Sequence, residues 1–509
     1  MIVKVTSGTI LGIVSHPVQV EVDISSGLPM FTTVGLPDAA VKESRDRIKA
    51  AIKNSGYPFP RTHLTVNLAP ADIRKEGTGF DLPIAVAILA AQGVIRSELL
   101  KNYLFSGELS LDGTVKAISG ILSNALLTRE LGMKGLIIPK DNVLEAAIVS
   151  GIDVIPVNTL ADVVEHLNGT RIIPPAICGP EDQLSPAVDY SVDFSEVRGQ
   201  DHAKRAMEIA AAGGHNMIMI GPPGSGKTML SHRLCTILPD LSLEEAIETS
   251  RIFSVAGLLD RSKPLLMRRP FRAPHHTISD AGLVGGGHQP RPGEISLAHQ
   301  GVLFLDELPE FGKHVLETLR QPLENGQVTI TRSAGVATYP ARFMLVAAMN
   351  PCPCGYYGDP QHTCRCSAQQ IRQYQGRISG PLYDRIDIHL EVPAVRYRDL
   401  RGSYTGESSV AIRERVCQAR EIQKGRFSGE PAPFNARMTE KQVKNFCQLD
   451  RESQQLIEMA MEKLGLSARA YSRILKLSRT IADLAGQQKI EAQQVAEAIQ
   501  YRNLDRRIV

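Results

Sequence analysis

Residues 215–230 read HNMIMIGPPGSGKTML, and this stretch decides the fold. An apolar run typical of a buried strand leads into the pattern G-x-x-x-x-G-K-T and then into a helical pattern, which is the order of a phosphate-binding P-loop. Glycines let such a loop wrap so that its backbone amides face phosphate oxygens, while the lysine reaches the β- and γ-phosphates and the threonine hydroxyl binds Mg²⁺. We therefore predict an ATP site made of Gly221, Pro222, Pro223, Gly224, Ser225, Gly226, Lys227 and Thr228.

Polar side chains end two more apolar runs downstream of the P-loop. Residues 301–307 (GVLFLDE) end in Asp306, placed to complete the Mg²⁺ shell, and Glu307, placed to orient or deprotonate the attacking water. Residues 343–350 (FMLVAAMN) end in Asn350, which can hydrogen-bond the γ-phosphate or that water. Because ligands meet parallel sheets at the carboxyl ends of strands, we expect these side chains to converge on the P-loop.

Hydrolysis also needs positive charge on the developing transition state, and a neighbouring subunit often supplies it. Arg385, within LYDRIDIHL, is our candidate for that charge. The alternative is a surface ion pair with Asp384 or Asp387, which would carry no catalytic role.

The totals place the chain among ordinary folded proteins. Its 509 residues, 43% hydrophobic and 22% charged, predict about three domains. Lys and Arg exceed Asp and Glu by only 57 to 54, so any polyanion site must be a local patch. The longest apolar run, residues 82–95, is too short to span a bilayer, and the N-terminus lacks the apolar core of a signal peptide. We therefore expect no membrane partner and a cytoplasmic location with reduced thiols.

The pattern changes twice along the chain. Residues 1–171 mix strand-like and helical runs, and residues 172–189 form a proline-rich linker. Residues 190–395 alternate strands and helices around the P-loop. The last region, residues 396–509, is almost entirely helical in period from residue 409 on. An α/β multidomain protein is therefore expected.

These motifs, in this order, resemble the AAA+ ATPases of the magnesium-chelatase-like group, and more closely the YifB/ComM family of competence-related ATPases. The resemblance implies an AAA+ core with a C-terminal helical lid and a homo-oligomer, a hexameric ring with ATP between subunits. It identifies Asn350 as sensor 1, Arg385 as the arginine finger and Arg469 as the sensor-2 arginine, with Arg473 as its rival. Members of the ComM type are associated with ATP-driven branch migration of recombination intermediates during natural transformation.

The N-terminal region resembles a Lon-protease-type domain through RKEGTGFDLPIAVAILAA, SGELSLDGTV and KGLIIPKDN. Activity of that domain requires a serine and a lysine. Aligning those stretches puts Asp81 where the serine belongs and Leu122 where the lysine belongs. Without a nucleophile and its base there is no acyl transfer, so we predict a scaffold that does not cleave peptides.

Two segments are candidates for contact with DNA. Residues 327–343 (QVTITRSAGVATYPARF) predict a β-hairpin with Arg332 at its tip, which resembles the pore hairpin of replicative-helicase and chelatase-type rings. A tip arginine grips phosphate independently of sequence, although an exposed arginine with no partner would look the same. Residues 261–276 (RSKPLLMRRPFRAPHH) are also rich in arginine, and their two histidines, His275 and His276, are as open to a structural role as to ligand binding.

Four of the eight cysteines lie close together. Cys352, Cys354, Cys364 and Cys366 form two C-x-C pairs, and a cytoplasmic location disfavours disulfides between them. The set predicts a Zn²⁺ site, a zinc knuckle directly after Asn350. Structural zinc usually takes C-x₂₋₄-C spacing, so His362 replacing one sulfur and four unbound thiols both remain open.

We therefore expect an ATPase that moves on branched or single-stranded DNA. Three alternatives have other cargoes: a chelatase-type motor acting on a protein partner, a protease, and a protein-remodelling ATPase. The Lon-like region and the cysteine cluster disfavour the first, Asp81 and Leu122 disfavour the second, and nothing excludes the third.

Overall fold

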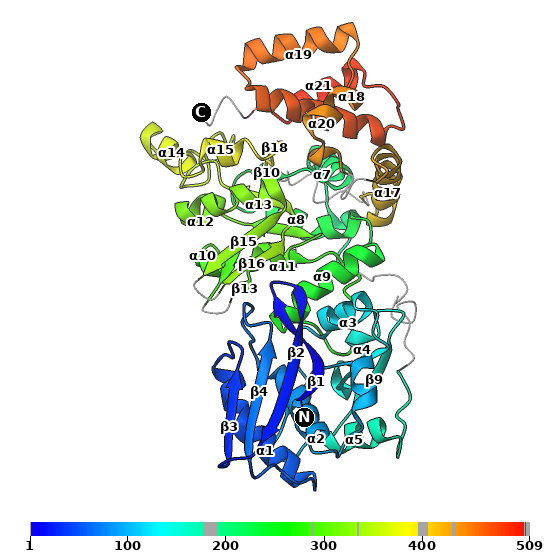
Figure 1. Cartoon of the computed structure of the whole chain (residues 1–509). Helices are drawn as coiled ribbons and strands as arrows, with labels where there is room; N and C mark the ends of the chain where they lie inside the picture. The colour runs from blue at the N-terminus through cyan, green and yellow to red at the C-terminus, as the bar shows by residue number, and fades with distance from the viewer. Residues whose placement is uncertain are drawn as a thin grey trace.

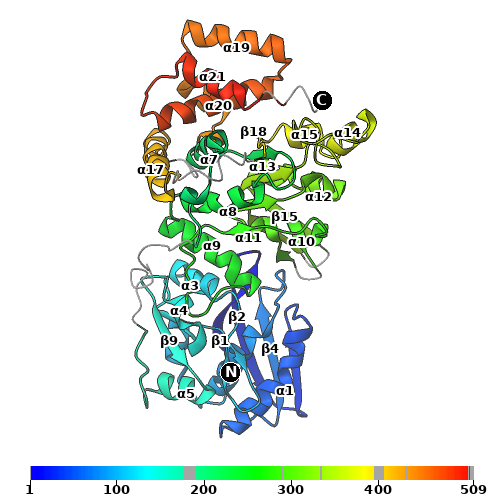
Figure 2. The same cartoon turned by 180° about the vertical axis from the view of Figure 1, so that it is seen from behind.

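The computed structural model describes residues 2–176, 191–287, 290–332, 335–394, 406–429, 434–502 and 504. Three bodies are stacked end to end: an N-terminal domain in blue and cyan, a motor domain in green and yellow, and a helical domain in orange and red (Figures 1 and 2). Most of the predicted linker, residues 177–189, lies outside the described residues. The fold class expected from the sequence, a multidomain α/β protein with a helical C-terminal region, is confirmed.

The N-terminal domain is built on a seven-stranded sheet in the order β3-β4-β2-β1-β5-β8-β9. Its strands are β1 (Ile2–Leu11), β2 (Val14–Ser25), β3 (Met30–Val34), β4 (His63–Ala69), β5 (Tyr103–Phe105), β8 (Gly135–Pro139) and β9 (Asp153–Val157), with a small β6 (Glu108–Leu109) and β7 (Val115–Lys116) ribbon. Its helices are α1 (Ala39–Asn54), α2 (Asp81–Ala91), α3 (Ile121–Glu130), α4 (Val143–Ala146) and α5 (Leu160–Asn168).

Helix α2 holds most of the longest apolar run and is buried from Asp81 to Ala90, as a core helix. A helix that is apolar all round in this way belongs to the interior of a domain. Across the described ranges, no helix combines the length and the apolar character needed to cross a bilayer.

The motor domain holds five parallel strands in the order β11-β14-β17-β10-β18. They are β11 (Phe271–Arg272), β14 (Val302–Leu305), β17 (Met344–Met349), β10 (Met217–Ile220) and β18 (Ile388–Glu391). Their apolar side chains, buried on both faces, explain the continuous hydrophobic runs in the sequence. Because β10 lies between β17 and β18, the loop that follows β10 emerges near the middle of the carboxyl edge.

Helices and two small ribbons surround this sheet. The helices are α7 (Asp201–Gly213), α8 (Lys227–Ile237), α9 (Leu243–Ala256), α10 (Asp280–Val284), α11 (Glu294–Leu297), α12 (Lys313–Thr318), α13 (Arg320–Asn325), α14 (Ala368–Gln375) and α15 (Gly380–Tyr383). The ribbons are β12 (Gly285–Gly286) with β13 (Arg291–Pro292), and β15 (Gln327–Arg332) with β16 (Gly335–Pro340).

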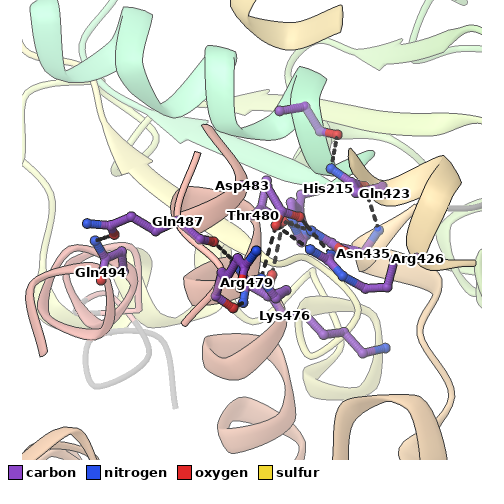
Figure 3. Close-up of polar contacts among 12 residues, drawn as sticks. His215, Gln423, Arg426, Asn435, Lys476, Arg479, Thr480, Asp483, Gln487 and Gln494 are labelled. Atoms are coloured by element: carbon purple, nitrogen blue, oxygen red, sulfur yellow. Dashed lines mark hydrogen bonds and ion pairs between the residues drawn. The ribbon is translucent and has the colours of Figure 1, made fainter. Parts of the chain in front are cut away.

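The helical domain contains α17 (Ser409–Arg426), α18 (Glu440–Phe446), α19 (Arg451–Leu464), α20 (Ala468–Leu484) and α21 (Ala492–Gln500). A buried polar network holds its helices together (Figure 3). Asp483, 2% exposed, accepts hydrogen bonds from Arg426 Nη1 at 2.8 Å, Arg479 Nε at 3.0 Å and Asn435 Nδ2 at 2.8 Å. Since breaking a buried ion pair leaves an uncompensated charge, this network resists separation of the helices.

The N-terminal domain contacts the motor through the β1–β2 turn and through α3 and α4. Ile13, in the turn, is buried in the apolar core of the motor, and its carbonyl accepts a hydrogen bond from Arg251 Nη2 at 2.8 Å. The Gly120 amide donates to Ser254 Oγ at 3.0 Å, and that hydroxyl donates to Glu145. Burial raises the pKa of Glu145. Polar and apolar contacts therefore join the two domains.

Candidate functional site

The P-loop joins β10 to α8 at the carboxyl edge of the motor sheet. Gly224 and Gly226 take left-handed backbone angles, with φ of 74° and 87°, which glycine adopts without strain. Lys227 Nζ donates to the carbonyls of Gly221 at 2.7 Å and Pro222 at 2.9 Å. Burial lowers the pKa of Lys227, because the ammonium loses water in the loop. Bound phosphate would offset that loss of hydration.

The acidic pair reaches the P-loop from β14. Asp306 directly follows the last residue of β14, and its Oδ2 accepts a hydrogen bond from Thr228 Oγ1 at 2.7 Å. Its Oδ1 accepts from the amide of Glu307 at 2.9 Å. A hydroxyl and a carboxylate oxygen are ligands that Mg²⁺ prefers, so the two predicted Mg²⁺ ligands fit the ion and lie together.

Glu307 stands in an unusual conformation beside a histidine. Its φ is 53°, in the left-handed region that non-glycine residues seldom adopt and that clusters at functional sites. His276 Nδ1 lies 3.3 Å from Glu307 Oε2. The sequence left the role of this histidine open, whereas the structure places it against the predicted water-activating carboxylate.

Asn350 follows the last residue of β17, the strand between β10 and β14. Its Oδ1 lies 3.4 Å from Lys227 Nζ, and Ser225 Oγ lies at the same distance from that nitrogen. The strands thus bring together side chains that are far apart in the sequence, as the strand order requires.

Gln200 is part of this site, and sequence reasoning missed it. Its Nε2 donates to the carbonyl of Ser225 at 2.7 Å, which supports the P-loop from outside. Gly199 and Gln200 both have positive φ, 62° and 55°, directly before α7. The glycine before a helical pattern was a local signal for this turn, but only the fold brings the glutamine to the loop.

Arg385 lies at the amino edge of the motor sheet, opposite the P-loop of its own chain. Strands β18 and β10 run parallel in register, with Ile388 beside Met217 and Glu391 beside Ile220. Arg385 precedes β18 and the P-loop follows β10, so the two are separated by about one strand length, about 13 Å.

The guanidinium of Arg385 is buried and pairs with a carboxylate that the sequence did not suggest. It donates to Glu324 and to the carbonyl of Pro381. The expected alternative, a pair with Asp384 or Asp387, is therefore wrong, because the fold places α13 and not these neighbours against the guanidinium.

The two sensor-2 candidates differ in how free their side chains are. Arg473 pairs with Asp387, which is buried and also accepts from His215 Nδ1 at 3.3 Å. Although burial alone would raise the pKa of Asp387, the positive charge of Arg473 and the hydrogen bond from His215 hold it below its ordinary range. Arg469 is 64% exposed and lies 3.6 Å from Asp384 Oδ2. Arg473 is thus held within the subunit, whereas Arg469 is accessible.

The four cysteines of the predicted knuckle converge on one point. All four Sγ atoms lie within 4.8 Å of one another, with Cys352 and Cys354 3.4 Å apart and Cys352 and Cys364 3.7 Å apart. Tetrahedral Zn²⁺ with bonds of about 2.3 Å separates its sulfurs by about 3.8 Å, so the set fits this ion. His362 lies outside the group, 3.6 Å from Asp359.

The knuckle rests on the P-loop. A Cβ added at Gly355, whose φ is 85°, would lie 2.6 Å from Cδ of Pro223. Only glycine lets the two loops approach this closely. Hydrogen bonds from the amides of Tyr356 and Arg365 lower the pKa of Cys354 to about 6, whereas the neighbouring thiols contribute to a raised pKa of Cys364 and of Cys366.

The predicted hairpin is present as β15 and β16. Its last pair is Arg332 with Gly335, so Arg332 stands at the tip, with its side chain exposed. The second basic segment is less free than its sequence suggests. Arg272 forms a bidentate pair with Glu294, with hydrogen bonds of 2.6 Å and 2.7 Å. An arginine that is paired in this way is not available to bind the phosphate backbone of DNA.

Three family models cover most of the chain. The model described as magnesium chelatase, subunit ChlI, matches residues 193–400; subunit ChlI of Mg-chelatase matches 20–142; and the ChlI C-terminal model matches 406–502. Competence protein ComM of Haemophilus influenzae is 46% identical over 97% of this chain and 96% of its own length. The chain belongs to the YifB/ComM family of magnesium-chelatase-like AAA+ ATPases. The protein YifB of Escherichia coli, uncharacterized, is 45% identical over 98% of this chain and 96% of its own length.

The relatives differ in how much of this chain they match: ComM and YifB match nearly all of it, whereas the chelatase subunits match only part. The chloroplastic magnesium-chelatase subunit ChlI of Oryza sativa subsp. indica is 23% identical over 60% of this chain and 67% of its own length. Because a ChlI model matches residues 20–142, the N-terminal domain by itself does not argue against a chelatase-type role. The similarity to ComM and YifB over nearly the whole chain is what distinguishes this protein from the chelatase subunits.

The N-terminal domain of this YifB/ComM family member holds its two predicted dyad positions in structural roles. Asp81, completely buried, accepts hydrogen bonds from Arg47 at 2.9 Å and 3.3 Å. Burial raises the pKa of Asp81 to about 6, against the opposing effect of Arg47. Leu122 is buried at the start of α3, where its amide donates to Glu145. Leu122 has no ionisable group, and the carboxylate of Asp81 is paired with Arg47.

Proposed function

We propose that this chain is an ATP-driven DNA motor that works as a hexameric ring and promotes branch migration of recombination intermediates, as its resemblance to ComM suggests. The proposal rests chiefly on one observation: the residues expected to act on ATP lie at two opposite edges of the central sheet. Lys227, Thr228, Asp306 and Asn350 meet at one edge of the motor sheet, while Arg385 stands at the other. A complete site then needs the arginine of a neighbouring subunit.

Each side chain at the carboxyl edge has a proposed task. Lys227 binds the β- and γ-phosphates, while Thr228 and Asp306 hold Mg²⁺, which neutralises charge between those phosphates. Glu307 orients and deprotonates the attacking water, and Asn350 fixes that water or the γ-phosphate. The contact of His276 with Glu307 sets the direction in which the carboxylate points.

At the amino edge we assign the trans-acting charges to Arg385 and Arg469. Arg469 is favoured over Arg473 as the sensor-2 arginine because its guanidinium is accessible, whereas Arg473 is held by the buried Asp387. Arg385 must leave Glu324 to act on a neighbour, so subunit contact would exchange an internal ion pair for contact with the γ-phosphate.

DNA is proposed to contact the tip of the β15–β16 hairpin, at Arg332. The root of this hairpin leads directly into β17, which ends next to Asn350, so the DNA contact and the γ-phosphate contact lie on one continuous segment. Movement of the strand end with nucleotide state would therefore move the hairpin.

The proposed function is tested by ATP hydrolysis with and without a mobile four-way DNA junction, with junction movement scored in parallel. We expect the junction to stimulate hydrolysis and ATP to drive its movement. Hydrolysis that is indifferent to every DNA would contradict a DNA motor and direct the search to a protein partner of the N-terminal domain.

Arg332→Ala is expected to weaken DNA binding equally for all sequences, because the tip arginine touches phosphate and not bases. The slope of log K against log salt should fall in magnitude by about 0.7 to 0.9 for each phosphate that Arg332 no longer neutralises. Anisotropy titrations of unrelated oligonucleotides at several salt concentrations measure both effects. Arg451→Ala, which removes an exposed arginine from α19, is the matched control. Unchanged affinity and salt slope in Arg332→Ala would exclude the hairpin as the DNA-binding element.

Zinc is proposed to occupy the cysteine knuckle, with Cys352, Cys354, Cys364 and Cys366 as its ligands. In the cytoplasm, where we place the protein, these thiols stay reduced and able to bind metal. The metal would hold a loop that buries little apolar surface in the shape that packs on Pro223.

Cys364→Ser is expected to lose the bound zinc, about one ion per chain, and to lower the unfolding temperature. ATP hydrolysis should fall as well, because the loop that packs on the P-loop loses its shape. Metal analysis of the purified protein and thermal unfolding measure the first two effects. Cys417→Ser, in α17 outside the cluster, should keep both at the parent values. A Cys364→Ser protein with unchanged zinc content would rule out this site.

A further inference from the structure

A narrow crevice lies at the amino edge of the motor sheet, between the motor and the helical domain. Its volume is about 40 Å³, and four arginines line it together with Phe434: Arg269, Arg342, Arg420 and Arg437. We call it the arginine crevice. The P-loop follows β10, whereas the crevice lies beside Gly214, which precedes β10. The crevice is therefore a different place from the ATP site, at the opposite edge of the sheet.

Two of the four arginines have structural partners. Arg269 Nη1 donates to the carbonyl of Gln300 at 2.7 Å, and its Nη2 lies 2.9 Å from Glu245 Oε2. Arg420 Nη2 donates to the carbonyl of Ala211 at 2.6 Å, and its guanidinium stacks on the Phe434 ring. The contacts of Arg269 and Arg420 with carbonyls explain their positions, but Glu245 is the only carboxylate within 4 Å of either in the described ranges.

The other two arginines converge without a partner of their own. Within the described residues, the guanidiniums of Arg342 and Arg437 have no hydrogen bond and no carboxylate within 4 Å. Both lie against Gly326: a Cβ there would be 2.8 Å from Arg437 Nη1 and 3.1 Å from Arg342 Cγ. Gly326, with φ of 66°, leaves the space in which they meet. The Arg437 guanidinium thus lies beside the side chain of Arg342, and neither arginine forms an ion pair within 4 Å in the described part of the chain.

The electrostatics agree with an excess of positive charge. Burial lowers the pKa of Arg420 to about 9, with Arg269 adding to the effect. Close cations that have lost water are unfavourable unless an anion joins them.

The acidic group that faces Arg342 is Glu248, which lies beyond ion-pair distance of the guanidinium among the described residues. Glu248 is engaged with His299, whose Nε2 lies 2.9 Å from Glu248 Oε2. His299 Nδ1 accepts a hydrogen bond from the backbone amide of Arg342 at 3.0 Å. The hydrogen bond from His299 lowers the pKa of Glu248, and the charge of Arg342 adds to this effect. Burial lowers the pKa of His299, which favours the neutral imidazole.

We propose that the arginine crevice binds a phosphate group. Guanidiniums hold phosphate through parallel, charge-assisted hydrogen bonds. The guanidiniums of Arg342 and Arg437, which make no hydrogen bond among the described residues, have donors for such an oxyanion. A cavity of about 40 Å³ has room for such a group, since about 10 to 15 Å³ holds one water molecule. Arg437 is exposed at the mouth of the crevice, so the site is open to ligands from solution.

The position of the crevice suggests what binding would do. Arg342 lies two residues after β16, at the root of the hairpin that carries Arg332, and Arg437 and Arg420 belong to the helical domain. A bound phosphate would therefore join the hairpin root to the helical domain. The phosphate can come from a nucleic-acid backbone or from a free phosphate compound, and the experiment separates these sources.

The test uses full-length protein carrying Lys227→Ala, so that phosphate binding at the P-loop does not interfere. Inorganic phosphate is titrated against chloride at constant ionic strength, with thermal unfolding as the readout. A fluorescent oligothymidylate of about 20 nucleotides is titrated by anisotropy, with and without competing phosphate. The variants are Arg437→Ala, at the exposed mouth, and Arg342→Gln, which keeps a polar side chain; Arg451→Ala is the control for loss of one exposed arginine.

We expect phosphate to raise the unfolding temperature of the parent and of Arg451→Ala, and its affinity to fall about tenfold or more in both crevice variants. If oligothymidylate affinity falls in the same variants and phosphate competes, the nucleic-acid backbone is the source. If oligothymidylate binding is unchanged, a free phosphate compound is the source. Equal phosphate affinity in all four proteins overturns the proposal. Because no hydrolysis is measured, the outcome does not depend on the proposed motor function.

Discussion

Lys227→Ala is expected to reduce ATP hydrolysis by at least about a hundredfold, the effect of losing one preorganised charge from a phosphate site. The ammonium lies within 3.4 Å of polar groups from three parts of the site: Gly221 O, Ser225 Oγ and Asn350 Oδ1. An ammonium at this position connects the P-loop to the end of β17. Steady-state phosphate release at saturating ATP measures the loss, and junction movement should vanish with it.

The variant should remain folded, which makes the result interpretable. Burial lowers the pKa of Lys227, so the charged side chain is held unfavourably and its removal does not leave an uncompensated charge of opposite sign. Lys424→Ala, an exposed lysine on α17, is the matched control and should retain the parent rate. Hydrolysis that persists in Lys227→Ala at more than about a tenth of the parent rate would contradict the assignment of the P-loop.

Mixing two inactive proteins should restore hydrolysis if the site is shared between subunits. Arg385→Ala keeps its P-loop but lacks the arginine, and its hydrolysis should fall by about a thousandfold or more. Lys227→Ala lacks the P-loop lysine but keeps Arg385. In mixed rings, the P-loop of the first protein faces the arginine of the second, so a substantial fraction of parent activity should return. The measurement is the hydrolysis rate as a function of mixing ratio.

The matched control for this experiment is Glu324→Gln. It removes the carboxylate that pairs with Arg385 while leaving the guanidinium in place, so hydrolysis should stay at the parent rate or rise. Loss of activity in Glu324→Gln together with Arg385→Ala would indicate that the ion pair, and not the free arginine, is what the enzyme needs. If the hydrolysis rate of the mixture does not exceed the sum of the rates of the two separate variants, a trans-acting Arg385 is excluded.

Local chemistry allowed much of the motor to be predicted from the sequence. Glycines and a lysine at fixed spacing after an apolar run define the P-loop, and GVLFLDE and FMLVAAMN show by composition alone that they are buried strands with polar ends. The hairpin at residues 327–343 follows from alternation and turn residues in the same way. These features depend on residues that are neighbours in the chain, so their signals are short and strong.

Contacts between distant segments were not predictable in this way. Gln200 supports the P-loop, and His276 meets Glu307, only because the start of α7 and the segment after β11 reach the carboxyl edge of the sheet. The alternative considered for Arg385, an ion pair with a sequence neighbour, named the wrong carboxylate: its partner is Glu324, 61 residues earlier. A side chain selects its partner by distance in space, which the sequence does not report.

The sequence by itself determined that this protein has an α/β domain with a P-loop, a helical C-terminal region and a compact set of four cysteines, because each follows from spacing over a few residues. Only the tertiary structure decided that Arg473 is held inside the subunit while Arg469 is accessible, that the knuckle rests on Pro223, and that four arginines from separate segments meet at one crevice. The physical reason is that burial and charge neutralisation depend on every group within a few ångströms, and folding alone brings those groups together.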